Sequence, residues 1–146
     1  MVESRVDDMI ERARSVVVLY PGLFQGSDSE RRQRRDQIEL EVSSRTGLSE
    51  QVCGLFGLDQ ETIKLDSAWA VYRYLQTQLL IAIDIAVRNH KQLTEPLDSK
   101  IRLGIEHDLH DADFLMLAAL EGCAATRKKK LRRMLKLLRS DIEILE

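Results

Sequence analysis

Apolar residues recur at steps of three and four along most of the chain, which is the spacing of one face of an α-helix. The first such stripe predicts a helix over about residues 3–20, which the Pro-Gly pair that follows should end. Ser27 is followed three residues later by Glu30, as in a capping box. This pattern predicts a second helix, rich in charge and lying on the outside, that extends to about Ser44.

The most apolar segment lies in the middle of the chain and contains neither Gly nor Pro from about residue 66 to 91. Its apolar residues cover most sides, so the segment predicts a central helix at about residues 68–90 with other helices packed around it. An ionised Asp84 would be costly in this setting without a partner. Arg88, one helical turn further on, is the partner that we expect.

Three more helices are expected in the C-terminal half. Thr94 and Pro96 suit the start of one helix. The acids after residue 110 suit the start of another, which Gly122 should end. A last amphipathic helix over about residues 126–140 should bury its apolar stripe, which consists of Leu131, Met134, Leu135 and Leu138.

Together with a short helix near residues 48–56, these elements predict an all-α fold. We expect one domain over residues 1–146, an orthogonal or bundle-like array of about six or seven helices. The length is typical of a single domain. The composition, with 44% hydrophobic and 32% charged residues, excludes general disorder. Few aromatic residues and few strand-forming runs are present, so no sheet is expected.

The two cysteines and the N-terminus bear on the compartment. Cys53 and Cys123 form no Cys-x-x-Cys pair, and we expect both to be reduced thiols in the core. The first residues are acidic and polar, unlike a secretory signal. The most apolar stretch, residues 79–87, contains Asp84 and is far shorter than the roughly 20 residues of a membrane span. We therefore expect a cytoplasmic protein without a membrane partner.

Residues 49–65 resemble the helix-turn-helix pattern of DNA-binding proteins. Cys53, Gly57 and Ile63 stand at the intervals where that pattern has a small residue, a turn glycine and a β-branched residue. Asp66 stands where a further apolar residue belongs, and acids outnumber the single Lys64. A tight junction between two ordinary helices is the alternative interpretation.

Residues 111–130 are distantly similar to the later half of PIN-class nuclease domains. In those domains an acid precedes an Ala- and Leu-rich helix that leads to a Thr-x-Asp turn. Here Lys128 follows Thr126 and Arg127 in place of the second acid, and no early strand carries a first acid. The similarity therefore does not place the chain in that family.

The last helix concentrates positive charge. Eight basic residues lie between Arg127 and Arg139, against three acids from residue 124 to the end. Four of the basic residues lie roughly opposite the apolar stripe, where they could contact nucleic-acid phosphates while the helix stays anchored: Lys129, Arg132, Arg133 and Lys136. In the alternative interpretation these charges are solvated or pair with the acidic remainder of the chain.

An acidic and histidine-rich segment spans residues 106–113. If one helix continues through it, Glu106, His110 and Asp113 share a face, and their imidazole and carboxylates could hold a divalent metal that activates water. The alternative is a solvated junction at which Asp111 or Asp113 caps the next helix.

No phosphate-binding glycine loop, nucleophile elbow or His-Glu-x-x-His helix is present. We therefore expect a non-catalytic, helical protein-interaction or regulatory module without a cofactor. Its partner would be another protein or a second copy, because adjacent apolar residues such as Leu115, Met116 and Leu117 exceed what one helix face buries. Nucleic-acid binding by the basic helix is the first alternative. A metal-dependent hydrolase built on residues 106–113 is the second.

Overall fold

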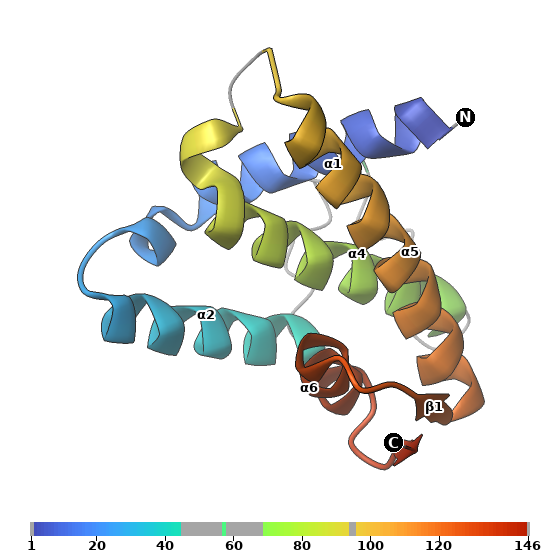
Figure 1. Cartoon of the computed structure of the whole chain (residues 1–146). Helices are drawn as coiled ribbons and strands as arrows, with labels where there is room; N and C mark the ends of the chain where they lie inside the picture. The colour runs from blue at the N-terminus through green and yellow to red at the C-terminus, as the bar shows by residue number, and fades with distance from the viewer. Residues whose placement is uncertain (1, 45–56, 58–68, 94–95, 146) are drawn as a thin grey trace.

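The computed structural model describes residues 2–44, 57, 69–93 and 96–145 (Figure 1). The described residues form five α-helices: α1 (Val2–Leu19), α2 (Asp28–Ser43), α4 (Trp69–Asn89), α5 (Ser99–Glu121) and α6 (Lys129–Leu138). They also form two 3₁₀ turns and two strands: η1 (Pro21–Phe24), η3 (His90–Gln92), β1 (Cys123–Ala125) and β2 (Glu143–Leu145). The predicted helical fold is thus confirmed in its class, but this part of the chain does not contain six or seven helices. The short helix near residues 48–56 and, except for Gly57, the helix-turn-helix-like segment lie outside the described residues.

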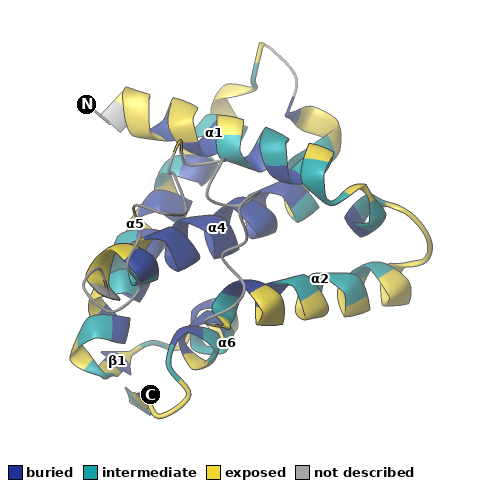
Figure 2. Ribbon diagram, turned by 180° about the vertical axis from the view of Figure 1, so that it is seen from behind, coloured by how far each residue is buried: buried dark blue, intermediate teal, exposed yellow. Residues whose placement is uncertain are grey.

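Helix α4 is the centre of the fold, as predicted. Its middle turns, residues 79–86, are buried on every side, and Figure 2 shows the helix dark blue among more exposed neighbours. Helices α1, α2, α5 and α6 all contact it. The apolar residues of α4 therefore form the centre around which the other four described helices pack.

The N-terminal helices end and begin where the sequence predicts. Helix α1 stops at Leu19, and Pro21 opens the turn η1. Both bonds of the capping box are present at the start of α2: the Ser27 hydroxyl accepts from the Glu30 N–H at 3.4 Å, and the Glu30 carboxylate accepts from the Ser27 N–H at 2.7 Å. Helix α2 lies on the outside and buries only Glu39 and Val42.

Side chains of α4 satisfy the carbonyl groups at the C-terminal ends of two other helices. The Gln76 amide donates to the carbonyls of Val42 and Ser43, at 3.1 and 3.0 Å, at the end of α2. Arg73 donates to the carbonyl of Leu138 at the end of α6. These carbonyls have no partner within their own helix, so the three hydrogen bonds orient α2 and α6 on the central helix.

Residues 99–121 form one helix where the sequence predicted two. Helix α5 runs through the acidic segment without a break and begins after Asp98, whose carboxylate accepts from the Lys100 N–H at 2.7 Å. The predicted start at Thr94 and Pro96 was therefore wrong. Gly122 ends the helix as predicted, at φ +83°, a left-handed conformation that costs glycine little.

The chain closes with a small parallel sheet that was not expected. Strand β1 pairs with β2 in the register Ala124 with Ile144, and α6 supplies the crossover that parallel strands require. Strands of three residues are too short to show an alternating pattern in the sequence. Helix α6 buries its apolar stripe as predicted.

Two further expectations concern the cysteines and the membrane. The expectation of a core thiol was wrong for Cys123, which is exposed because it lies on the short edge strand β1. Cys53 lies outside the described residues. None of the helices in the described part of the chain is both long enough and apolar enough to cross a bilayer.

Candidate functional site

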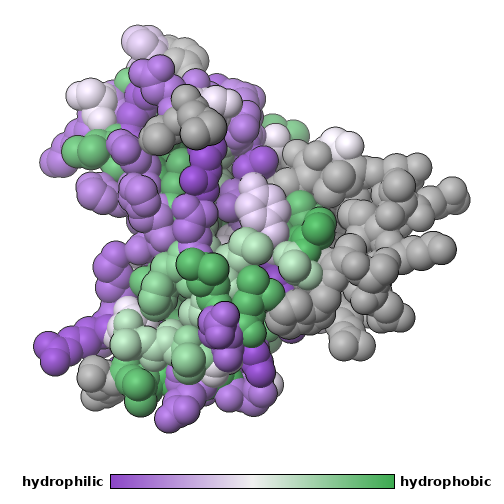
Figure 3. Space-filling view, turned by 90° about the vertical axis from the view of Figure 1, so that its right-hand side faces the viewer, coloured by the Kyte–Doolittle hydropathy of each residue, from purple (hydrophilic) through white to green (hydrophobic). Residues whose placement is uncertain are grey.

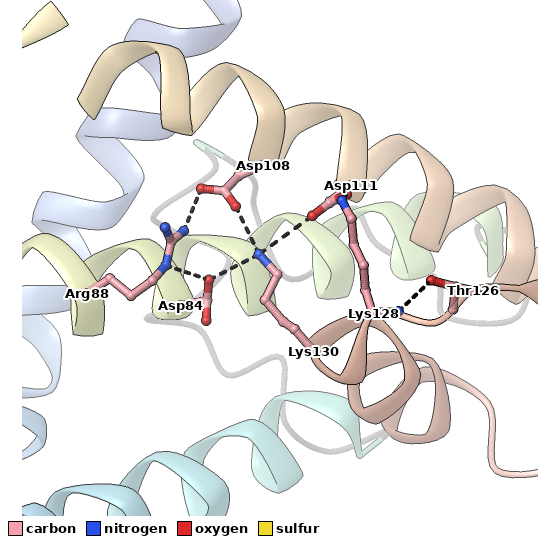
Figure 4. Close-up of polar contacts among 7 residues, drawn as sticks. All are labelled: Asp84, Arg88, Asp108, Asp111, Thr126, Lys128 and Lys130. Carbon is pink, nitrogen blue, oxygen red and sulfur yellow. Dashed lines mark hydrogen bonds and ion pairs between the residues drawn. The ribbon is translucent and has the colours of Figure 1, made fainter. Parts of the chain in front are cut away.

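Acidic and basic side chains from three helices meet between α4, α5 and α6 (Figure 4). This charge cluster consists of Asp84, Arg88, Asp108, Asp111 and Lys130. Arg88 donates through Nε to Asp84 at 3.0 Å and through Nη2 to Asp108 at 2.5 Å. The Lys130 amine lies 2.9 Å from Asp108, 3.3 Å from Asp84 and 3.7 Å from Asp111.

Burial explains why the charge cluster is so fully paired. Asp84 and Asp108 are 8% and 5% exposed, and an ionised carboxylate at that depth is costly unless a cation and hydrogen bonds compensate it. The predicted pairing of Asp84 with Arg88 is confirmed. The sequence did not predict the pairing of Asp84 with Lys130, because Lys130 is distant along the chain and reaches Asp84 only when α6 packs against α4.

The two cations are held in their charged forms. Burial alone would lower the pKa of Arg88, but the negative charge of Asp84 and the hydrogen bond to Asp108 outweigh it and raise the pKa. Burial also opposes the charge of Lys130, yet the hydrogen bond to Asp108 and the charge of Asp84 raise its pKa as well. The charge cluster is therefore an ion-pair network that joins three helices.

Lys128 adds a cation beside this cluster. Its amine contacts the Asp111 carboxylate at 2.8 Å, and its backbone N–H donates to the Thr126 hydroxyl at 3.2 Å. Lys128 stands at the position where PIN-class domains carry an acid. The carboxylate of Asp111 is thus paired with a lysine, and the turn after β1 contributes a positive rather than a negative charge.

The three residues of the predicted metal site do lie on one continuous helix. Glu106 is half-buried, His110 is exposed, and Asp113 pairs with Arg5 of α1 at 2.7 Å. Within the described residues, no three His, Cys, Asp or Glu side chains come together in a group that could hold a metal ion. The metal site therefore stays a prediction from sequence.

The four predicted nucleic-acid contacts differ in their surroundings. Lys129 is exposed, and the Lys136 amine donates to the carbonyl of Ile142 at 2.9 Å. Arg132 is half-buried and interacts with another group of the protein. Arg133 pairs with Glu39 of α2, which is 1% exposed. Arg133 thus joins α6 to α2, in line with the alternative that part of this charge pairs with acidic residues of the same chain.

Apolar side chains gather where α5 ends. Leu117 of α5 is 63% exposed, Leu145 of β2 is 56% exposed, and Val71 and Tyr74 of α4 are 48% and 36% exposed. Figure 3 shows apolar atoms over the lower part of this face, below a hydrophilic upper part. We call these four residues the α5-end surface.

The α5-end surface spans different elements. Leu117 lies one helical turn after Asp113, which binds Arg5, and Tyr74 of α4 is close enough to Arg5 to contribute to its raised pKa after the larger effect of Asp113. The sequence pointed to Leu115, Met116 and Leu117 as surplus apolar residues. Leu115 is buried, Met116 is half-buried and Leu117 is exposed, so one of the three belongs to this surface. Only the packing of α4 and β2 beside α5 revealed the others.

No protein-family model, curated protein or solved structure matches this chain. Its function is therefore inferred from its own residues.

Proposed function

We propose that this protein is a non-catalytic interaction module that contacts another protein chain, a second copy or a different protein, through the α5-end surface. The observation that carries the proposal is the apolar area on the face shown in Figure 3, together with the exposure of four apolar side chains on α4, α5 and β2: Val71, Tyr74, Leu117 and Leu145. Single exposed apolar residues are common on proteins, but apolar side chains that gather on one face mark interaction sites.

The energetics favour association at this surface. Burial of one leucine-sized side chain contributes roughly 1.5–3 kcal/mol, so a few such residues supply a large part of the free energy of a moderate complex. The tyrosine offers both an apolar ring and a hydroxyl, the combination that is enriched at interfaces. The charge cluster supports this role indirectly, because it holds α5 and α4 in a fixed arrangement on which the surface depends.

The test compares Leu117→Glu with Leu40→Glu. Leu40 on α2 is 61% exposed and so matches Leu117 in exposure while lying outside the α5-end surface. Sedimentation of the purified protein over a range of concentrations should show self-association that Leu117→Glu abolishes and Leu40→Glu leaves unchanged, at low and high salt alike.

Binding of a different protein is tested with a photo-crosslinking amino acid at position 117 and, in a separate variant, at position 40. A crosslinked protein band that appears with position 117 and not with position 40 supports the proposal. Absence of both self-association and a position-specific crosslink would show that the surface has no protein partner.

Nucleic-acid binding through α6 is a second candidate, because Lys129 and Lys136 are exposed on this helix. Binding to phosphates would weaken steeply between about 50 and 200 mM salt. It would also be lost in the double variant Lys129→Glu/Lys136→Glu. Fluorescence anisotropy with labelled single- and double-stranded oligonucleotides measures both effects, and no binding at low salt would remove this candidate.

A further inference from the structure

A cavity of about 380 Å³ lies between η1, the first turns of α2 and the end of α4. In Figure 1 these segments lie on the opposite side of the molecule from the end of α5. Leu23, which is buried, and Phe24 and Val87, which are half-buried, form the apolar part of the cavity lining, which we call its floor. The Phe24 ring packs against His90, with centroids 4.7 Å apart and planes inclined by 36°. The volume lies within the range of small-molecule sites, roughly 300–1,000 Å³.

The rim of the cavity is strongly cationic. Arg31, Arg32, Arg35 and Lys91 line it, and among the described lining residues Asp28 is the one acid. Hydrogen bonds hold two of the guanidinium groups: Arg31 binds Asp28 and the carbonyl of Gly26, and Arg35 binds Asp36 at 3.0 Å.

The other two cations, Arg32 and Lys91, are available to a ligand as far as the described residues go. Arg32 and Lys91 are exposed, and neither pairs with a carboxylate of the described residues. Positive charges gathered around one hollow repel each other, and a bound anion would relieve that repulsion.

We propose that this cavity binds a nucleoside phosphate. Guanidinium groups recognise phosphate oxygens through paired hydrogen bonds, and a lysine amine adds a point charge. The apolar floor beside the Phe24 and His90 rings offers the contact that a planar base requires. Phosphate alone would make no use of the floor, and a neutral ring compound would make no use of the rim, so the two parts together indicate a ligand that carries both groups. The inference is independent of the α5-end surface.

The experiment is isothermal titration calorimetry of the full chain at low salt, with ADP, adenosine and inorganic phosphate as separate probes. ADP should bind at least about tenfold more tightly than either adenosine or phosphate, because only ADP occupies both floor and rim. The variant Arg32→Ala/Lys91→Ala should weaken ADP binding at least about tenfold. Since both side chains are exposed and form no ion pair within the described part of the chain, this variant should fold normally, which circular dichroism checks.

A matched control is Arg127→Ala/Lys129→Ala, which removes two exposed cations that lie outside the cavity and have no carboxylate partner among the described residues, and it should leave ADP binding unchanged. Phe24→Leu keeps the floor apolar but removes the ring, and it should weaken ADP while leaving phosphate binding unchanged. Three outcomes would overturn the proposal: no ADP binding, equal affinity for ADP and phosphate, or equal weakening by the two double variants. A single-stranded oligonucleotide that binds where ADP does not, and that Arg32→Ala/Lys91→Ala releases, would assign the cavity to nucleic acid instead.

Discussion

Lys130 joins α6 to two carboxylates that are nearly buried on other helices. Its side chain is only 28% exposed, whereas that of Lys128, two residues earlier, is 65% exposed and contacts a single acid, Asp111, which Lys130 also approaches at 3.7 Å. A pair of buried carboxylates that loses one of its two cations retains an uncompensated charge. A surface pair contributes little because water and salt screen it. The two lysines should therefore differ greatly in their effect on stability.

We expect Lys130→Met to lower the free energy of unfolding by about 2 kcal/mol. Without Lys130, the two nearly buried carboxylates of Asp84 and Asp108 would share one cation, Arg88. Lys128→Met should lower it by less than about 0.5 kcal/mol. Urea denaturation followed by circular dichroism measures both. Equal losses in the two variants would mean that the charge cluster does not stabilise the fold.

The contribution of Lys130 should also depend on pH. Its pKa is raised in the folded protein above the ordinary value of 10.5, so its stabilising effect is complete below that value and is lost as the pH rises through the folded-state pKa. The difference in stability between the natural protein and Lys130→Met should therefore stay constant from neutral pH to about pH 10 and shrink above it. Denaturation midpoints over this range test the sign, and a difference that grows at alkaline pH would contradict it.

At the scale of single elements, helix ends depend on short polar motifs next to them. The capping box at the start of α2 satisfies N–H groups that the helix itself leaves unpaired. Because α2 buries few residues of its own, it gains less from packing than α4 does, and its start should be sensitive to this local motif.

Ser27→Ala should destabilise the protein by about 1 kcal/mol, through loss of the hydroxyl that caps α2. Ser29→Ala is the matched control, because Ser29 is exposed in the first turn and makes no side-chain hydrogen bond with a described residue. Thermal unfolding and amide exchange over residues 28–32 give the two readouts. If the control variant frays α2 as much as Ser27→Ala does, the cap is not the cause.

For the molecule as a whole, ion pairs between helices that are distant in the sequence determine the position of α6. Arg133 of α6 pairs with Glu39 of α2, 94 residues away in the sequence. Glu39 is 1% exposed, and its second oxygen has no partner among the described residues. The pair therefore fixes the position of α6 while leaving one buried polar atom unsatisfied.

Arg133→Met alone should cost about 3 kcal/mol, because it leaves the Glu39 carboxylate buried without its cation. The double variant Arg133→Met/Glu39→Leu should recover most of that loss, since two apolar side chains can pack in place of a buried ion pair. Urea denaturation of the single and double variants measures the difference. A double variant as unstable as the single one would show that Arg133 acts through packing of its aliphatic stem.

Interactions close in the sequence were predictable here. The helical spacing in α1 and α4, the capping box at Ser27, the glycine end of α5 and the pairing of Asp84 with Arg88 all depend on residues within a few positions of each other. A periodic apolar stripe also identified the buried face of α6. Such features follow from backbone geometry, which is the same wherever the helix lies in the fold.

Interactions between distant residues were decided by the tertiary structure. The acids of residues 106–113 looked like a junction, but the packing of α5 against α1 and α4 keeps one helix continuous through them. Strands β1 and β2 exist because α6 brings their short segments side by side. Lys130, Arg133 and the members of the α5-end surface meet partners from other elements, and the rim cations meet across a cavity. The sequence by itself determined the helical class of the fold and the apolar faces of α1, α4 and α6. The charge cluster, the apolar surface and the cavity depend on how the helices pack, because long-range contacts leave no local periodicity in the chain.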